Sequence, residues 1–196
     1  DINLMLGKIK YTDDGVVNTM KNWRKALDAG CFIDNHQNYS WQEAQPALIN
    51  GEAAMYLMGN FLVPNLPQET QDNLDYWQFP DINPGMARGE DAPTDLIFMP
   101  ANAQNKDNAK KFLEFVAQAE NIEAIAGAIQ NLPTHKDAAP LDDRFLKKGA
   151  KVLAASKTAQ FYDRDTTPEM ASAGMQGFQD FMLNPDDMMD ILEEIE

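Results

Sequence analysis

The chain has 196 residues, of which 44% are hydrophobic and 24% are charged, proportions that are ordinary for a soluble globular protein. Acidic residues outnumber basic ones by 31 to 16, which gives a net charge of -15. Such a surface repels phosphate backbones and anionic lipid headgroups, so it argues against nucleic-acid binding and disfavours binding to membranes. No apolar run approaches the roughly 20 residues that a membrane span needs.

The sequence contains one cysteine and two histidines that lie far apart. An internal disulfide is therefore excluded, and a zinc cluster, which needs several such ligands, is not expected. Cys31 follows Gly30 at a predicted helix end, and we expect it to be a small buried hydrophobe. A nucleophilic Cys31 paired with His36 or His135 has no local motif behind it.

A first helix is predicted over residues 16–27, whose apolar side chains recur at helical spacing. Asp13 or Asp14 can cap its start, and Gly30 fits its end. Trp23 lies on the apolar face of this helix. We therefore expect Trp23 in the core and not at a ligand.

A capping box follows at residues 40–43, where Ser40 and Glu43 can satisfy each other's amide groups. The helix after it should be bent or shortened by Pro46 and end at Gly51. Three short apolar runs, 53–58, 74–79 and 96–99, predict buried strands. Trp77 belongs to the second of these and is expected to be buried. Residues 81–93 are rich in Pro, Gly and Asp and predict a loop.

The rest of the chain is predicted to be mostly helical, with helices after Asn105 and over residues 120–128, 141–155 and 168–183. Thr167 can cap the last of these, with Pro168 at its first helical position. A final acidic helix should begin after residues 184–185. The methionines that crowd this end are expected to fill gaps in the core and at interfaces.

Motifs for a catalytic centre are absent from the sequence, which has no nucleophile elbow, phosphate-binding loop, dinucleotide-binding turn or zinc-binding helix. Asp163, Arg164 and Asp165, with Glu169 nearby, lack the glycine and the spacing of a calcium loop. These residues fit either a solvated charged loop or a sugar site, because carboxylates and Arg form charge-assisted hydrogen bonds with hydroxyl groups. Carboxylate pairs also serve glycosidases, so a hydrolase stays open.

Residues 51–61 (GEAAMYLMGNF) resemble the G-x-A-A-M-x-x-x-G-x-[WF] segment of extracellular sugar-binding proteins, the group that includes maltose-binding protein. Further pieces occur in the order that this family has. They are SWQEA at 40–44, a run ending in FP at 79–80, an apolar run with a polar exit at 96–102, NAKKFLEF at 108–115, NLPT at 131–134 with Asn in place of the usual Gly, and GFQDFM at 177–182 before an acidic helix. The resemblance covers nearly the whole chain.

The resemblance implies an α/β protein of the periplasmic-binding-protein type II class, with two lobes that close over a sugar. It also implies that the chain is a fragment lacking the amino-terminal half, mostly helical with a few short strands. Residues 1–93 and 134–196 would belong to the carboxy-terminal lobe, and residues 94–133 would return to the amino-terminal lobe. The strand near Leu96 would then lack neighbours, which predicts self-association through this unpaired strand or local disorder.

The function that the resemblance implies is that of a solute-binding component of an ABC importer, located in the periplasm or outside the cell, either soluble or lipid-anchored. It would capture a mono- or oligosaccharide and deliver it to the transporter's membrane subunits, without enzymatic activity and without a cofactor or metal. A glycoside-active enzyme and a sugar-sensing module for a receptor are the alternatives. Nucleic acid is not an expected partner.

Four of the expected ligand-binding residues lie at two positions where the resemblance places sugar contacts. Phe61 occupies the position where the family often has a Trp that stacks on the sugar, although Phe is also common in cores. Asn60 beside it can donate and accept hydrogen bonds, or it can serve as a turn residue. Thr94 and Asp95 lie at the presumed crossing between lobes, where the alternative is a turn that enters a strand.

Four more candidates lie elsewhere in the chain. Asp163, Arg164 and Asp165 directly precede a predicted helix, at a place where the family also brings polar groups to the cleft. Trp41 is an aromatic candidate for a sugar contact. A Trp in its position is more often part of the apolar face of a helix.

Overall fold

A computed structural model of the chain describes residues 2–139 and 141–196. Asp1 and Pro140, which fall in the predicted segments 1–93 and 134–196, lie outside the described residues. The chain divides into two compact units. Unit 1 comprises the described residues through Met55, residues 91–93 and residues 159–196, and unit 2 comprises the described residues of 56–90 and 94–158. The predicted assignment of segments to lobes concerns a longer protein and stays a prediction.

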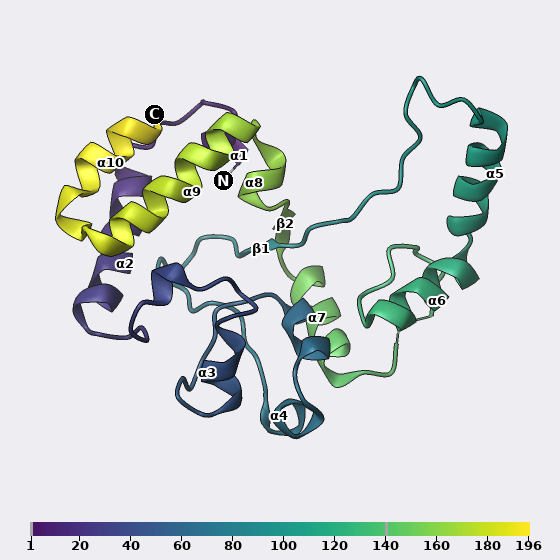
Figure 1. The fold of residues 1–196 in the computed structure, drawn as a ribbon, viewed down its shortest axis with the longest axis horizontal. Helices are drawn as coiled ribbons and strands as arrows, with labels where there is room; N and C mark the ends of the chain where they lie inside the picture. Colours follow the sequence, from purple (N-terminus) through teal and green to yellow (C-terminus); the bar gives the residue numbers. More distant parts are fainter. Residues whose placement is uncertain (1, 140) are drawn as a thin grey trace. The chain divides into compact units, whose positions relative to one another are not determined.

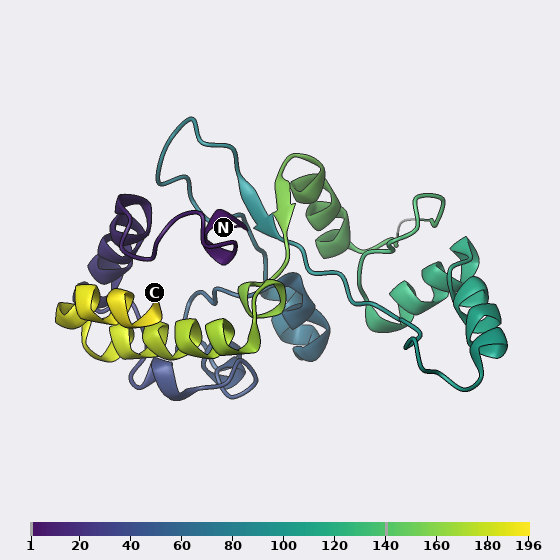
Figure 2. The ribbon, with the colours of Figure 1, turned by 90° about the horizontal axis from the view of Figure 1, so that it is seen from above.

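Unit 1 is built from helices that surround a small core. They are α1 (Ile2–Met5), α2 (Asp14–Asp28), α3 (Gln45–Ile49), α8 (Tyr162–Asp165), α9 (Pro168–Leu183) and α10 (Met188–Ile195), with 3-10 helices η1 (His36–Asn38) and η3 (Pro185–Asp187). Helices α2, α9 and α10 lie side by side in Figures 1 and 2. The long helix α9 is therefore the central element of unit 1.

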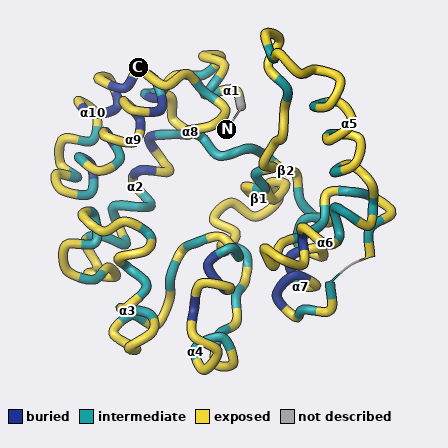
Figure 3. The backbone as a smooth tube through the Cα atoms, turned by 45° about the vertical axis from the view of Figure 1, so that its right-hand side comes forward, coloured by how far each residue is buried: buried dark blue, intermediate teal, exposed yellow. Residues whose placement is uncertain are grey.

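The core of unit 1 lies between α2, α9 and α10, and Figure 3 colours parts of these helices as buried. Phe181 of α9 and Leu192 of α10 are both 0% exposed. The ring of Trp23 packs against this core, with its centroid 5.3 Å from that of Phe181. The prediction that Trp23 belongs to the core is confirmed.

Glycines on α9 let its neighbours approach closely. A Cβ atom at Gly177 would collide with the side chain of Ile195 on α10, and one at Gly174 would collide with the ring of Tyr162. The hydroxyl of Tyr162 in turn donates a hydrogen bond to the Met170 carbonyl, over 3.0 Å. The spacing of three residues puts both glycines on one face of α9, which is the face that its partners cover.

Several helix ends and turns have the capping contacts that the sequence predicts. Ser40 and Glu43 form the predicted capping box, since the Ser40 amide donates to the Glu43 carboxylate over 2.9 Å and the Glu43 amide to the Ser40 hydroxyl over 3.3 Å. The Thr167 hydroxyl accepts from the Met170 amide and caps α9. Helix α7 (Arg144–Ala154) begins three residues later than predicted, because the Asp143 side chain caps it.

The predicted burial of Cys31 is wrong, since its side chain is exposed. Gly30 adopts a positive φ of 64° and ends the helical path of α2. Cys31 follows at the point where the chain leaves the helix, beyond the face that packs on the core. A free cysteine is usually buried only where a neighbouring element covers it.

Unit 2 contains the remaining helices, which are η2 (Asn60–Asn65), α4 (Gln68–Asn73), α5 (Lys106–Val116), α6 (Ala119–Ile129) and α7. The strands β1 (Gly89–Asp91) and β2 (Lys157–Ala159) pair with each other, and a unit boundary falls within each. This pair is the sheet that the described residues form. The structure thus has the expected class, mostly helical with few short strands.

The three predicted strands are wrong as strands. Residues 53–58, 74–79 and 96–99 lie outside any helix or strand, and β1 instead forms inside the predicted loop 81–93. Trp77, expected to be buried, is 62% exposed. An apolar run becomes a strand only when a neighbouring segment takes up its backbone hydrogen bonds, and the described residues provide no such neighbour for these three.

None of the described helices combines the length and the apolar character that crossing a membrane requires. The longest of them, α9, has 16 residues.

Replacing Phe181 with Ala should lower the free energy of unfolding of unit 1 by about 3–5 kcal/mol, because it removes a fully enclosed ring and leaves a cavity. Urea unfolding followed by tryptophan fluorescence measures this, since Trp23 contacts the ring. The control is Leu183→Ala on the same helix, where the side chain is 54% exposed and a change within ~0.5 kcal/mol is expected. Equal losses in both variants would contradict the description of this core.

Candidate functional site

The eight sequence-predicted ligand residues divide between the two units. Asn60, Phe61, Thr94 and Asp95 belong to unit 2, and Trp41, Asp163, Arg164 and Asp165 belong to unit 1. Within unit 2, Asn60 and Phe61 lie at the start of η2, where neighbouring residues contact both of them.

The ring of Phe61 folds back over Gly59, the residue that precedes η2. A Cβ atom at Gly59 would lie 2.7 Å from the Phe61 Cδ1 atom, so a side chain there would force the Phe61 ring to move. The Asn65 side chain donates a hydrogen bond to the Phe61 carbonyl over 2.8 Å and ties the two ends of η2 together. The half-buried ring is therefore held at the start of a short, locally closed turn.

Asn60 faces α7 at Gly149. A Cβ atom at Gly149 would lie 3.7 Å from the Asn60 amide nitrogen, 3.2 Å from the Tyr76 hydroxyl oxygen and 3.9 Å from a methyl of Leu132. Three segments distant in sequence thus converge on one helical glycine. We call this set of residues (Asn60, Tyr76, Leu132 and Gly149) the Gly149 cluster.

Tyr76 fixes the position of this cluster on α7. Its hydroxyl donates to the Phe145 carbonyl over 2.9 Å, and its ring stacks on that of Phe145 with centroids 6.2 Å apart. Burial raises the pKa of the Tyr76 phenol, with a further contribution from the Asp75 carboxylate. Tyr76 therefore stays protonated and serves as a neutral donor.

Lys148 supports the same ring from the solvent side. Its ammonium lies 5.1 Å from the centre of the Tyr76 ring and 2.8 Å from the Asp75 carboxylate. The hydrogen bond from Lys148, together with one from the Tyr76 amide, lowers the pKa of Asp75. This contribution to stability is present above the ordinary carboxyl pKa and is lost as pH falls through the lowered value.

The other candidates occupy exposed positions. Thr94 and Asp95 are exposed, in a segment that forms neither helix nor strand. Asp163, Arg164 and Asp165 form the short helix α8 instead of a loop, and their side chains are exposed. The Arg164 guanidinium lies 5.5 Å from the centre of the Phe161 ring. Trp41 is half-buried in the turn that precedes α3.

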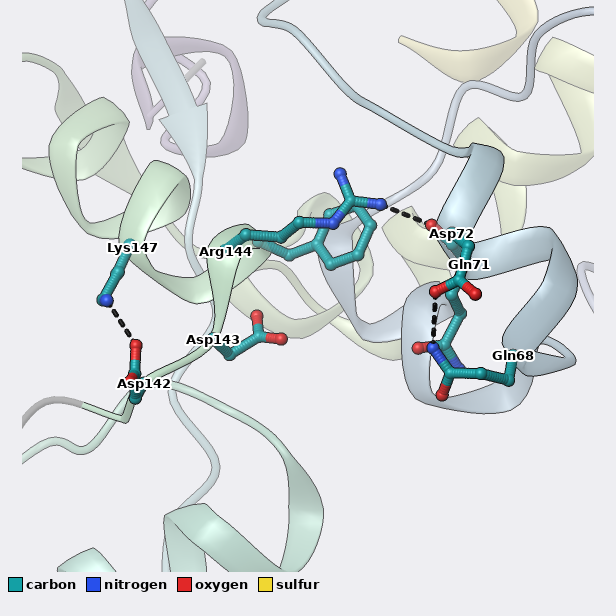
Figure 4. A pocket seen from close by; sticks show the side chains of 8 residues that line it. Gln68, Gln71, Asp72, Asp142, Asp143, Arg144 and Lys147 are labelled. Atoms are coloured by element: carbon teal, nitrogen blue, oxygen red, sulfur yellow. Dashed lines mark hydrogen bonds and ion pairs between the residues drawn. The ribbon is translucent and has the colours of Figure 1, made fainter.

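An open pocket of about 410 Å³ lies elsewhere in unit 2, between α4 and the start of α7, and none of the eight candidates lines it. Figure 4 shows Arg144 reaching from α7 to α4. Its guanidinium donates to the carbonyls of Gln71, within α4, and Leu74, directly after it. Lys147 pairs with Asp142, and Asp143 caps α7. Arg144 therefore links the start of α7 to α4 across this pocket, whereas the other two contacts act at the start of α7 itself.

Within the described ranges, 2–139 and 141–196, no group of three or more His, Cys, Asp or Glu side chains is arranged to hold a metal ion.

Most of the chain matches one known protein family. Residues 4–155 match the family of bacterial extracellular solute-binding proteins. Because this match covers more than half of the chain, the chain belongs to that family. The resemblance inferred from the sequence motifs is thereby confirmed.

Two known proteins are similar to this chain. The chain is 32% identical to the uncharacterized ABC transporter extracellular-binding protein PH1214 of Pyrococcus horikoshii over 127 residues, which are 63% of this chain and 28% of that protein. A solved structure of the bacterial solute receptor AcbH, described as having an exclusive substrate preference for β-D-galactopyranose, is similar with a TM-score of 0.90 and 30% identity. That likeness covers 100% of this chain and 51% of AcbH, so the chain spans about half the length of this receptor.

Sequence reasoning missed Tyr76 and Gly149. Tyr76 was hidden in a predicted strand, and Gly149 in the middle of a predicted helix. A glycine inside a helix costs about 1 kcal/mol relative to Ala, and that cost was the one available signal of a close approach. The partners that approach it could not be known without the fold.

Gly149→Ala tests the Gly149 cluster. The gain in helix propensity is about 1 kcal/mol, but the new methyl would press on a Tyr76 hydroxyl that its hydrogen bond and stacked ring hold in place, and such overpacking costs about 1–3 kcal/mol. We expect a net loss of about 1 kcal/mol in chemical denaturation. In the control Gly127→Ala on α6, the nearest atom would lie at an ordinary 3.7 Å, so the propensity gain should appear. A stabilised Gly149→Ala would contradict the close approach.

Proposed function

We propose that this chain is part of a solute-binding protein that captures a galactose-type sugar and passes it to the membrane subunits of an ABC transporter. The observation that supports this most directly is the likeness of the whole chain to the galactopyranose receptor AcbH, with a TM-score of 0.90. The similarity to an ABC transporter binding protein supports the transport role. Such a protein acts in the periplasm or outside the cell, which agrees with the family's extracellular description.

The aromatic ring of Phe61 is the proposed platform for the sugar. One face of a galactopyranose ring presents C–H groups, which pack well on an aromatic face, while the hydroxyl groups at its edge need hydrogen-bond partners. Asn60 directly precedes Phe61, and its side-chain amide has both a hydrogen-bond donor and an acceptor. The two residues at the start of η2 therefore supply the two kinds of contact that a neutral sugar requires.

The exposed polar candidates are proposed as further contacts in the longer protein. Thr94 and Asp95 begin the segment assigned to the other lobe, and Asp163, Arg164 and Asp165 lie on α8, directly before α9. Carboxylates and a guanidinium form charge-assisted hydrogen bonds with sugar hydroxyls. Trp41 is a second aromatic candidate.

The proposed mechanism is capture without chemistry. Sugar binding stabilises the closed form only to the extent that the sugar has a higher affinity for the closed form than for the open form. The closed form then docks on the transporter. No step of this cycle needs a nucleophile or a general acid, so we assign the protein as a binder and not as a glycosidase.

Phe61→Ala should weaken D-galactose binding about tenfold, a loss of roughly 1.4 kcal/mol, because it removes the stacking surface. Phe61→Trp keeps an aromatic face and should retain binding. Isothermal titration calorimetry on the complete product of the reading frame that contains residues 1–196 measures both. Phe32→Ala, which truncates an exposed Phe of unit 1 outside the candidate site, is the matched control. Unchanged affinity in Phe61→Ala would remove Phe61 from the site.

A further inference from the structure

Helix α8 is a single turn, and three of its four residues are the charged candidates for sugar contacts. Asp163, Arg164 and Asp165 are exposed, whereas Tyr162 is half-buried. A one-turn helix is not stable by itself in water, because it forms too few hydrogen bonds for the dihedral angles that it fixes. The places of the three charged side chains therefore depend on what holds Tyr162.

The ring of Tyr162 is seated on one face of α9. Figure 1 shows α8 beside the first turns of α9. A Cβ atom at Gly174 would lie 2.8 Å from the Tyr162 Cζ atom, so the bare backbone of α9 leaves the room that the ring occupies. The same ring lies 6.0 Å from the ring of Phe178, measured between centroids. Gly174 and Phe178 are four residues apart and so share one face of the helix.

Hydrogen bonds between two phenols extend this contact. The Tyr162 hydroxyl donates to the Met170 carbonyl over 3.0 Å, and its oxygen lies 2.5 Å from the hydroxyl oxygen of Tyr11. A phenol has one hydrogen to donate. Since the hydrogen of Tyr162 points to Met170, Tyr11 is the donor between the two phenols. The Met170 sulfur, 3.6 Å from the Tyr11 hydroxyl, is a weaker acceptor beside it.

Tyr11 gives this chain of hydrogen bonds a fixed end. It lies in the turn between α1 and α2, is 3% exposed and belongs to the same core as Phe181. Burial raises the pKa of the Tyr11 phenol, with a further contribution from the hydrogen bond to Tyr162, so Tyr11 keeps its hydrogen at neutral pH. A buried hydroxyl without a partner is costly, which favours the bonded arrangement.

We propose that Tyr11 and Tyr162 are positioning residues of the sugar site, because their hydrogen bonds hold α8 on α9 and fix the places of its charged side chains. This inference rests on the proposed function, in which α8 contacts the sugar. A site whose contact residues are in place in only a fraction of the molecules has its affinity reduced by that fraction. The two hydroxyls act through α8, since both are bonded within unit 1.

Tyr162→Phe and Tyr11→Phe test this proposal, because each removes one hydroxyl and keeps the ring. The amides of Arg164 and Asp165 both donate to the Phe161 carbonyl and report on α8. With one ordinary hydrogen bond lost, we expect these amides to exchange about fivefold faster and D-galactose to bind about fivefold more weakly. Hydrogen-exchange mass spectrometry and isothermal titration calorimetry on the complete product of the reading frame measure the two effects.

Ile191→Val is the matched control. Ile191 lies on α10, is 9% exposed and belongs to the same core as Tyr11, so shortening it should lower the stability of unit 1 to a similar extent. It should leave both the exchange of the α8 amides and the affinity for D-galactose unchanged, because local opening does not follow global stability. The control thus separates positioning from a general loss of stability.

Unchanged exchange of the α8 amides in both Phe variants would overturn the proposal, as would faster exchange with unchanged affinity for D-galactose. Equal effects in Ile191→Val would overturn it as well. If the unsubstituted protein binds no D-galactose, the proposed function fails, and the exchange of the α8 amides alone decides whether the two tyrosines hold α8 in place.

Discussion

The packing of α9 against α10 determines the rest of unit 1. Gly177 lets Ile195 approach the backbone of α9, and this approach encloses Phe181 and Leu192 completely. Trp23 of α2 then packs on the same core. Because α2 and α10 lie near opposite ends of the sequence, this core joins the first and last parts of the chain into one unit.

Unit 2 depends on a different kind of contact. Its helix α7 is held by the Tyr76 hydroxyl, by Arg144 on the carbonyls of Gln71 and Leu74, and by the stacked rings of Tyr76 and Phe145. Asn60 lies beside Gly149 of this helix, with Phe61 next to it at the start of η2. A binding site benefits from such fixed positions, because pre-ordered groups lose little entropy when a ligand arrives.

The helices were largely predictable from the sequence, whereas the strands and several burial states were not. The bounds of α9 and the capping box at Ser40 follow from contacts within a few residues, so local patterns contain the information. Whether residues 96–99 form a strand, or whether Trp77 is buried, depends on which segments far away in the sequence pack beside them. The same holds for the site, where Phe61 could be nominated from the resemblance but the approach of Tyr76 to Gly149 could not.

The most direct test of the central claim is equilibrium dialysis of the complete protein against labelled D-galactose, followed by recovery and chemical analysis of the sugar. A protein that captures sugar without changing it should bind one galactose per molecule, saturably, and release it intact. Saturable binding followed by recovery of a modified sugar would make the protein an enzyme. No binding of galactose would contradict the proposed ligand while leaving the family membership in place.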